Sequence, residues 1–189
     1  MTIRDVLKLG RLELINKTMN VSFPLDDKSK ECIKDMKDTL LSIPNSAGLA
    51  ANQILIDKQI IVYRIPKERV NKDEEYFDDP IVLINPKIDI FSDHKEDGWE
   101  GCLSIPGIRA VVPRYKEIHV SGYDENGILC EKYVKGFHAR NLQHEIDHLN
   151  GLTIFDRIEE KSFISFKSEL IEGIMAYKNC IKNSMGDIP

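Results

Sequence analysis

The sequence has little of what defines several large protein classes. Its four cysteines are far apart and form no CxxC pair, and a chain of 189 residues does not need disulfide staples. No apolar run approaches the roughly 18 residues that a membrane-spanning helix requires. Lysine and arginine form no dense block, and the formal net charge is −5. We therefore expect neither membrane insertion nor nucleic-acid specificity.

The N-terminal segment also lacks the apolar stretch of a secretory signal. Its acidic residues Asp5 and Glu13 argue against a transit peptide. We therefore expect a cytoplasmic, reducing location, in which disulfides are rare. Three of the cysteines are expected to be buried thiols: Cys32, Cys130 and Cys180.

Apolar residues are abundant enough for one compact core. Hydrophobic types make up 42% of the chain, and a chain of this length typically buries about 70% of the surface of its unfolded form. No internal repeat is evident, so we expect a single domain over residues 1–189. Its parts are a core over 1–158, a C-terminal helix over 159–182 and a tail over 183–189.

Hydrophobic spacing predicts helices and short strands that do not alternate. The first helix covers Asp26–Ile43, where apolar residues recur at helical spacing before Pro44. An Asn-Gly step within residues 124–127 predicts a β-hairpin. Because strands and helices do not alternate, we expect an α+β fold with mostly antiparallel sheet. The remaining expectations are strands over 59–65, 81–84, 117–123 and 128–134, an exposed loop over 66–80, and helices over 137–150 and 159–182.

The strongest chemical signal is an HExxH sequence formed by His144, Glu145 and His148. Two histidines four residues apart lie on one face of a helix, where both imidazoles can bind one divalent ion. Glu145 can then act on a water at the ion without being a ligand itself. A surface helix with two solvated histidines is the alternative. An apolar stripe beside the histidines argues against it: Ala139, Leu142, Ile146 and Leu149.

A catalytic metal site of this kind needs a third protein ligand. Glu169 and Glu172 could supply it, but both lie in the predicted terminal helix, where acidic residues are expected on the solvated face. Cys102 lies between Gly101 and a Ser-Ile-Pro-Gly sequence, so we expect irregular backbone that leaves its sulfur free to point at an ion. Thiolate is also a softer ligand than carboxylate and suits Fe²⁺ or Zn²⁺ better. Cys102 is therefore the favoured third ligand.

A third segment, Ser46–Gln53, is rich in small residues that let a ligand approach the backbone. By itself it could equally be a tight loop with a surface glutamine. In order, however, GLAANQ at 48–53, EGCLSIPG at 100–107 and QHEIDHLNG at 143–151 resemble the three signature motifs of the peptide deformylases. The resemblance extends from the opening residues through about Asp156.

This resemblance implies a metal-dependent hydrolase that removes the N-formyl group from the initiator methionine of nascent polypeptides and releases formate. It implies antiparallel sheets packed around a central helix that carries HExxH, with an N-terminal helix and a C-terminal helix. One divalent ion per chain would be held by Cys102, His144 and His148, with Fe²⁺ expected in the cell and Zn²⁺ or Ni²⁺ in preparations. N-formyl-Met peptides and ribosome-associated nascent chains would be the partners.

Roles around the ion follow from the same resemblance. A metal-bound hydroxide would attack the formyl carbon, and Glu145 would move the proton from the water to the leaving amine. The Gln53 amide and the Leu103 backbone N–H would hold the developing oxyanion. The candidate substrate-binding residues are Gly48 and Leu49 through their backbone, Phe137 and Asn141 for the Met side chain, Arg109 for the peptide further along, and Glu100, which could instead orient a histidine or a pocket residue.

Ser46 and Ala47 depart from the family pattern, which usually has glycine and then a bulkier aliphatic residue. If the backbone needs a positive φ at Ser46, that residue is strained by about 1 kcal/mol, whereas Ala47 leaves more room beside the Met pocket. Asn52 replaces a common proline or threonine. Two alternative functions stay open: an HExxH metalloendopeptidase with a downstream glutamate ligand, and an inactive metal-binding module.

Overall fold

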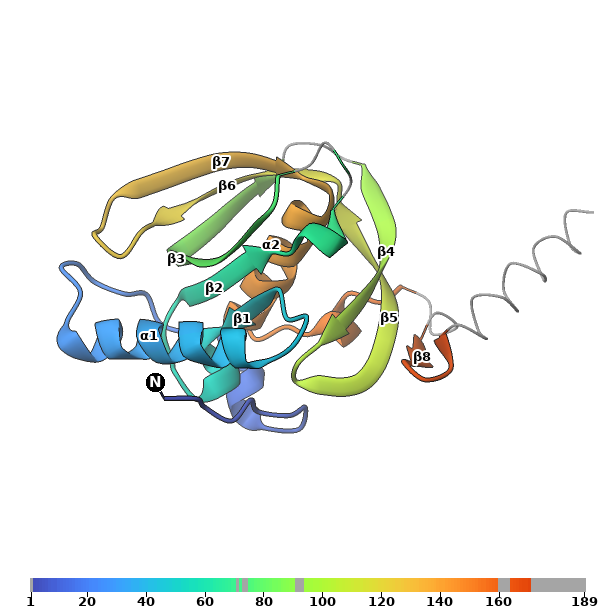
Figure 1. The fold of residues 1–189 in the computed structure, drawn as a ribbon, viewed down its shortest axis with the longest axis horizontal. Helices are drawn as coiled ribbons and strands as arrows, with labels where there is room; N and C mark the ends of the chain where they lie inside the picture. Colours follow the sequence, from blue (N-terminus) through green and yellow to red (C-terminus); the bar gives the residue numbers. More distant parts are fainter. Residues whose placement is uncertain (1, 71, 73–74, 91–93, 160–163, 171–189) are drawn as a thin grey trace, which may run out of the picture.

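The computed structural model describes residues 2–70, 72, 75–90, 94–159 and 164–170 (Figure 1). Four short 3₁₀ helices, η1 to η4, cover Leu12–Leu14, Ala51–Ile54, Lys67–Arg69 and Ile154–Asp156. The α-helices and strands are α1 (Asp27–Ser42), β1 (Gly48–Ala50), β2 (Ile60–Ile65), β3 (Phe77–Ile90), β4 (Lys95–Cys102), β5 (Ile105–Tyr115), β6 (Glu117–Tyr123), β7 (Leu129–Lys135), α2 (Gly136–Leu149) and β8 (Ile164–Phe166).

The larger sheet is antiparallel, with strand order β1-β2-β3-β6-β7. Its strand β2 is apolar on both faces, and successive side chains of a strand point to opposite sides. Ile60 and Val62 pack in the hydrophobic cluster that contains the core residues of α1. Ile61 and Tyr63 pack in the cluster that contains the core residues of α2. The two helices therefore cover opposite faces of this sheet (Figure 1).

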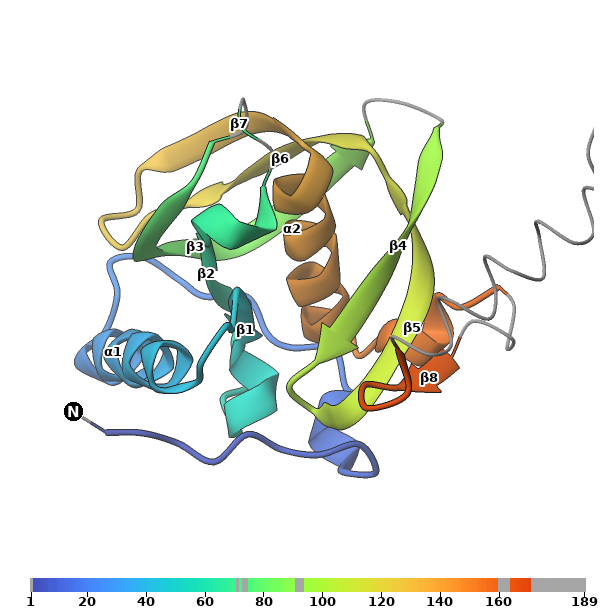
Figure 2. The same ribbon diagram turned by 45° about the vertical axis from the view of Figure 1, so that its right-hand side comes forward.

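The smaller sheet has strand order β4-β5-β8 and is also antiparallel. Strands β4 and β5 form a hairpin that turns at Leu103 and Ser104. Helix α2 lies between this hairpin and the larger sheet (Figure 2) and contacts β1, β2 and β5. Buried side chains of β4 and β5 pack with Ile154 of η4 in a third cluster. This arrangement is an α+β fold built on antiparallel sheets, as predicted.

Most local predictions are confirmed. Helices α1 and α2 and strands β2, β6 and β7 match the predicted ranges within a residue or two. In the β6–β7 turn, Asp124 Oδ1 accepts hydrogen bonds from the backbone N–H groups of Asn126 and Ile128, and Gly127 has φ of +79°. Strand β3 begins at Phe77, so the predicted loop over 66–80 is too long, and η3 lies within it. The sequence analysis did not predict β1, β4 or β5.

The predicted terminal helix over 159–182 is wrong at residues 164–166, which form β8. Ile108, Arg109 and Ala110 of β5 pair with these residues. An open strand edge offers hydrogen bonds that override a local helical pattern, since β structure depends strongly on its partners. Residues 160–163 and 171–182 of the same prediction, and the predicted tail over 183–189, lie outside the described residues.

Cys32 is buried as predicted, but Cys130 is exposed. Cys130 lies on β7, an end strand of the larger sheet whose side chains are exposed on both faces over most of its length. Cys180 lies outside the described residues. Within the described ranges, no helix has the length and apolar character needed to cross a bilayer.

Candidate metal centre

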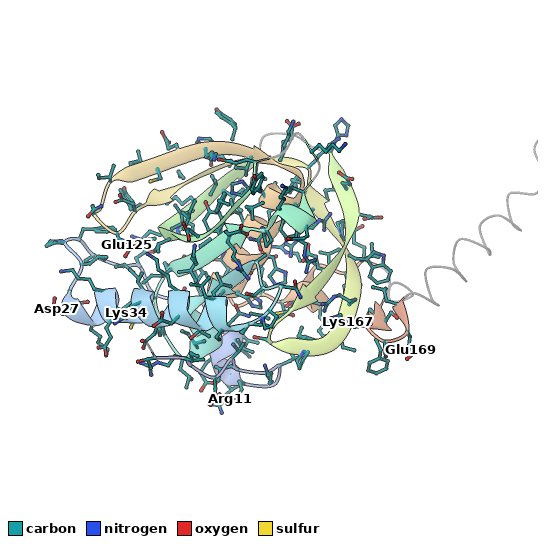
Figure 3. All side chains as sticks on the ribbon, viewed as in Figure 1. Arg11, Asp27, Lys34, Glu125, Lys167 and Glu169 are labelled. Atoms are coloured by element: carbon teal, nitrogen blue, oxygen red, sulfur yellow. The ribbon has the colours of Figure 1, made fainter. Side chains whose placement is uncertain are left out.

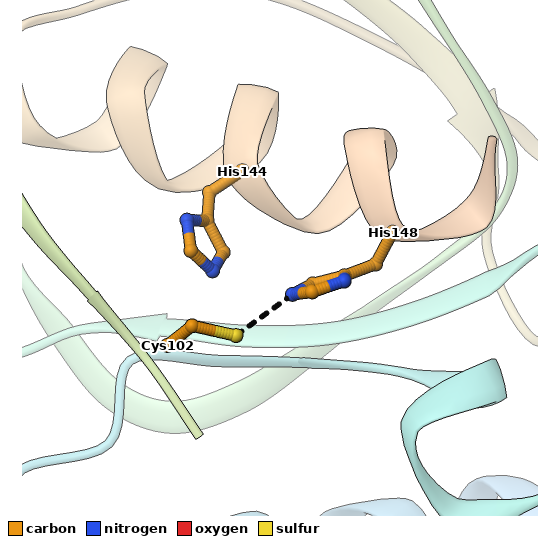
Figure 4. A group of neighbouring side chains, drawn as sticks. All are labelled: Cys102, His144 and His148. Atoms are coloured by element: carbon orange, nitrogen blue, oxygen red, sulfur yellow. Dashed lines mark hydrogen bonds between the residues drawn. The ribbon is translucent and has the colours of Figure 1, made fainter. Parts of the chain in front are cut away.

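Helix α2 presents both histidines of the HExxH sequence to the same side. Ala139, Leu142 and Leu149 are fully buried in the core, and this packing fixes the rotation of the helix about its axis. The rings of His144 and His148 are consequently buried one turn apart, with their centroids 5.1 Å from each other. Both point towards Cys102 (Figure 4).

Cys102 completes a three-residue cluster. Its Sγ lies 3.1 Å from Nε2 of His148 and accepts a hydrogen bond from the backbone N–H of Ser104. The potential ligand atoms of Cys102, His144 and His148 all lie within 4.8 Å of one another. A thiolate and two imidazoles fit the ligand preferences of Zn²⁺ and Fe²⁺, and three protein ligands leave a position for water or substrate.

The backbone that carries Cys102 differs from the prediction. Cys102 is the last residue of β4 and pairs with Ile105, so it does not lie on irregular backbone. A register shift between Glu100 and Cys102 interrupts the β4–β5 ladder. Such a shift changes the direction in which side chains point at the end of a strand. The sequence analysis had expected a loop to give the Cys102 sulfur this freedom.

The downstream alternative finds no support in the described residues. Glu169 is exposed next to β8 at the periphery (Figure 3) and is not part of the cluster around the histidines. Glu172 lies outside the described residues.

The cluster favours an ionised sulfur. Burial alone would raise the pKa of the Cys102 thiol, but the adjacent His148 and His144 lower that pKa well below its usual range. Burial likewise disfavours protonated His144, whereas Cys102 and Glu100 raise the pKa of His144 above its usual range. Both directions favour a thiolate beside a protonated imidazole. A metal ion needs the same thiolate and neutral imidazoles, so its binding would release protons.

Glu100 lies behind His144 and orients it. Its Oε2 is 2.9 Å from Nδ1 of His144, an arrangement that directs Nε2 of the ring towards the cluster. Arg114 and Arg140 also donate hydrogen bonds to the Glu100 carboxylate. Despite burial, His144 and Arg114 lower the pKa of Glu100 far below its usual range. Of the two roles considered for Glu100, this geometry favours orientation of a histidine.

The network continues to the far side of α2. Arg114 also pairs with Asp147, whose carboxylate accepts two further hydrogen bonds from Arg157. Sequence analysis missed Arg114, Arg140 and Arg157, because an arginine in a strand or helix carries no local sign of its partner. Asp147 gave no signal either, since its neighbours on the helix face, Gln143, His144 and Asn150, are all polar.

Glu145 is buried against the backbone of β1. A Cβ atom at Gly48 would lie only 2.3 Å from Oε1 of Glu145, so the absence of a side chain at Gly48 makes this position available. Oε2 of Glu145 has no hydrogen-bond partner among the described residues. Burial raises the pKa of Glu145, although His144 and His148 oppose that effect. A carboxylate with a raised pKa suits proton transfer near neutral pH.

Gln53 and Asn52 reach the cluster from η2. Gln53 Oε1 accepts a hydrogen bond from the backbone N–H of Ala50, which orients the amide so that Nε2 donates to Ser104 Oγ at 3.1 Å. The same Nε2 lies 3.8 Å from Sγ of Cys102. Asn52 Nδ2 donates to the backbone carbonyl of His148 at 2.5 Å. Asn52 therefore ties η2 to the end of α2, a bond that proline cannot make.

The remaining candidates lie around this cluster. Asn141 Nδ2 donates to the backbone carbonyl of Ala47 at 3.0 Å, and Phe137 is half-buried against the α2 cluster. Arg109 lies over Gly101, where an added Cβ would meet its guanidinium. Leu103 follows Cys102, and its carbonyl accepts a hydrogen bond from Nζ of Lys8. Gly48 and Leu49 lie in β1, which has one strand neighbour in the sheet.

A sequence profile decides the relationship of this protein to known ones. The profile of polypeptide deformylases matches residues 3–163. The chain belongs to the polypeptide deformylase family. The chain is 39% identical over 181 residues to peptide deformylase 2 of Ralstonia nicotianae, covering 94% of this chain and 99% of the relative. It is 40% identical over 162 residues to peptide deformylase 1 of Bordetella pertussis, and the alignment covers 84% of this chain and 89% of that relative.

Solved structures of the polypeptide deformylase family have the same fold. A Met-Ala-Ser-bound class I type b peptide deformylase from Acinetobacter baumannii superposes with a TM-score of 0.74 at 32% identity, covering 83% of this chain and 99% of that one. Peptide deformylase from Ehrlichia chaffeensis superposes with a TM-score of 0.74 at 30% identity, covering 96% of this chain and 98% of that one.

The departure from the deformylase pattern at Ser46 causes no strain of the expected kind. The left-handed residue of this turn is Asn45, with φ of +59°, and Ser46 does not have a positive φ. Ser46 instead donates its hydroxyl to the carbonyls of Leu40 and Ile43. Both carbonyls also accept a backbone N–H, from Ile43 and from Ser46 itself, so the hydroxyl adds a second donor at the end of α1.

Proposed function

We propose that this chain hydrolyses the N-formyl group of the initiator methionine of nascent polypeptides and releases formate. The observation that carries the proposal is the convergence of a thiolate, two imidazoles, a buried carboxylate and an amide donor. Cys102, His144 and His148 form the cluster, Glu145 lies in the same helix, and Gln53 reaches the sulfur. A related enzyme of the same fold is solved with Met-Ala-Ser, the product that such a reaction would leave.

The three clustered residues would hold one divalent ion, and we propose Fe²⁺ in the cell, with Zn²⁺ or Ni²⁺ in its place in preparations. When bound, the ion supplies Lewis-acid chemistry and lowers the pKa of water from 15.7 towards about 7. Glu100 keeps His144 in the tautomer that presents Nε2 to the cluster. Asn52 and the packing of α2 fix the position of His148.

Glu145 would move the proton. Hydrolysis adds water to the formyl carbon and breaks its bond to the amine nitrogen, so one proton must pass from the water to that nitrogen. The Glu145 carboxylate accepts it and then donates it to the leaving amine. The pKa of Glu145, raised by burial, makes its carboxylate a better acceptor of the proton from water. The amide Nε2 of Gln53 and the backbone N–H of Leu103 donate hydrogen bonds to the oxyanion that forms on the formyl oxygen.

The peptide would bind along the free edge of β1. Gly48 and Leu49 offer backbone groups there, as in other cases where a peptide adds a strand to a sheet. Phe137, at the start of α2, and Asn141 would form part of the pocket for the Met side chain. Nascent chains at the ribosome that carry formyl-Met are the partners this chemistry requires.

Formate release from formyl-Met-Ala-Ser by the Fe²⁺-loaded protein, prepared without oxygen, tests the proposal. Cys102→Ser should abolish both metal binding and formate release, whereas Cys130→Ser, which alters the exposed cysteine of β7, should affect neither. Glu145→Ala should retain the metal and lose turnover by a factor of about 10² to 10⁴.

The two alternative functions predict other outcomes. A metalloendopeptidase would cleave internal peptide bonds and would keep its metal after Cys102→Ser. An inactive module would bind metal and release no formate. Either outcome would overturn the proposal.

A further inference from the structure

The N-terminal segment connects two parts of the metal centre. The backbone N–H of Leu7 donates to the carbonyl of Gln53 at 2.7 Å, and that of Leu9 donates to the carbonyl of Ser104 at 2.8 Å. Gln53 lies in η2, whereas Ser104 lies in the turn between β4 and β5. The segment therefore bridges the two parts of the chain that supply the Gln53 amide and the Cys102 sulfur.

The same segment is anchored at α1. Two nitrogens of the Arg4 guanidinium donate to Oδ2 of Asp35, a buried carboxylate. The backbone N–H of Arg4 donates to Thr39 Oγ1 at 2.9 Å, and Val6 packs against the hydrophobic cluster that contains the core residues of α1. The backbone on both sides of Lys8 is consequently held in place, although the Lys8 side chain is exposed.

The Lys8 ammonium reaches the turn that follows Cys102. Its Nζ donates to the carbonyl of Leu103 at 3.0 Å. A hydrogen bond from a charged donor is about twice as strong as one between neutral groups. The peptide group that joins Leu103 to Ser104 therefore has a cation at its oxygen.

The nitrogen of that peptide group faces the sulfur. The N–H of Ser104 belongs to the same amide as the carbonyl of Leu103, and it donates to Sγ of Cys102 at 3.3 Å. Linked hydrogen bonds polarise one another, so a cation at the amide oxygen makes the N–H a stronger donor. A hydrogen bond to a metal ligand from outside the coordination sphere tunes that ligand and its ion. The charge of Lys8 can thus act on the sulfur through a single amide.

We propose that Lys8 is a positioning residue of the metal centre and acts on the Cys102 thiolate through the peptide N–H of Ser104. A thiolate that accepts a stronger hydrogen bond donates less charge to its ion, and the ion then polarises a carbonyl or a water more strongly. Loss of the Lys8 ammonium should therefore slow hydrolysis. Lys8 has for Cys102 the role that Glu100 has for His144. This inference rests on the proposed function and adds a residue to the groups that support it.

The test compares Lys8→Met and Lys8→Arg with the wild-type full chain. Formate release from formyl-Met-Ala-Ser by the Fe²⁺-loaded proteins gives kcat, and the Co²⁺-loaded proteins give the wavelength of the thiolate-to-metal charge-transfer band. Groups that touch a metal ligand directly contribute about 10- to 100-fold to affinity or activity. Because Lys8 acts through one intervening amide, we expect Lys8→Met to lower kcat by about three- to tenfold.

Lys8→Met should also move the charge-transfer band to longer wavelength, because a sulfur with a weaker hydrogen bond gives up its electrons more easily. Lys8→Arg retains a cationic donor and should restore most of both values. Lys34→Met removes the same charge from the exposed face of α1 (Figure 3) and should change neither. A merely structural role of Lys8 would change the stability of the protein and leave the band in place.

An unshifted band in Lys8→Met, or a kcat equal to that of Lys34→Met, would refute the role of Lys8 and leave the deformylase function standing. Failure of the wild-type protein to release formate would instead refute the proposed function, and the wavelength of the band would then decide the role of Lys8 by itself.

Discussion

Replacing Arg114 by methionine tests how strongly the buried ionic network holds the metal centre together. The Arg114 side chain is 4% exposed and joins Glu100, at 2.9 Å, to Asp147. Breaking a buried ion pair costs about 3–5 kcal/mol, because the remaining charge loses its partner in a poorly solvated place. Here Glu100 keeps Arg140, and Asp147 keeps Arg157. We therefore expect Arg114→Met to lower the free energy of unfolding by about 3 kcal/mol, at the lower end of that range.

For a chain of this length, about 3 kcal/mol corresponds to a decrease in Tm of roughly 6–12 °C. Thermal and urea unfolding of the metal-loaded variant would measure the change. Arg11→Met is the matched control, since Arg11 and Glu13 form an exposed pair, and such pairs contribute little to stability. If the two variants destabilise the protein equally, the buried network does not have the structural role assigned to it.

Three further predictions concern the same region. Glu100→Gln should weaken metal affinity about 10- to 100-fold in a chelator competition, because His144 loses its charged partner; unchanged affinity would contradict the orienting role. Gly48→Ala should reduce formate release far more than metal content, since its methyl group displaces Glu145; full activity would show that Glu145 need not lie there. His138, packed between Tyr63 and Phe77, has its pKa lowered by burial to about 4. Because the unfolded chain takes up that proton first, stability should fall as pH decreases from about 6.5 to about 4, by up to roughly 3 kcal/mol. Urea unfolding of His138→Phe should show a flatter pH dependence, and an identical profile would exclude His138 as the cause.

Local sequence signals predicted the elements that are stabilised locally. Helix α1 has an N-cap, Asp26, which accepts a hydrogen bond from Ser29, and apolar spacing that fits a single buried face. The β6–β7 hairpin is fixed by its own turn, in which Asp124 and Gly127 act within a few residues. Such features need no distant partner, so the sequence displays them.

Elements that depend on distant partners were missed. Strands β4 and β5 contain Gly98, Gly101, Pro106 and Pro113, which disfavour a strand on propensity alone. Their mutual pairing and the cover provided by Ile154 stabilise them nonetheless. Strand β8 forms because its backbone pairs with an edge of β5 that is otherwise without a strand neighbour among the described residues.

The sequence by itself determined the chemistry of the site. HExxH places two imidazoles on one helical face, and the motifs around Gln53 and Cys102 supply an amide and a soft ligand at fixed positions in the chain. Only the tertiary structure decided which glutamate reaches which atom. Glu100 lies behind His144, and Glu145 lies against Gly48, because α2 is held between the two sheets (Figure 2).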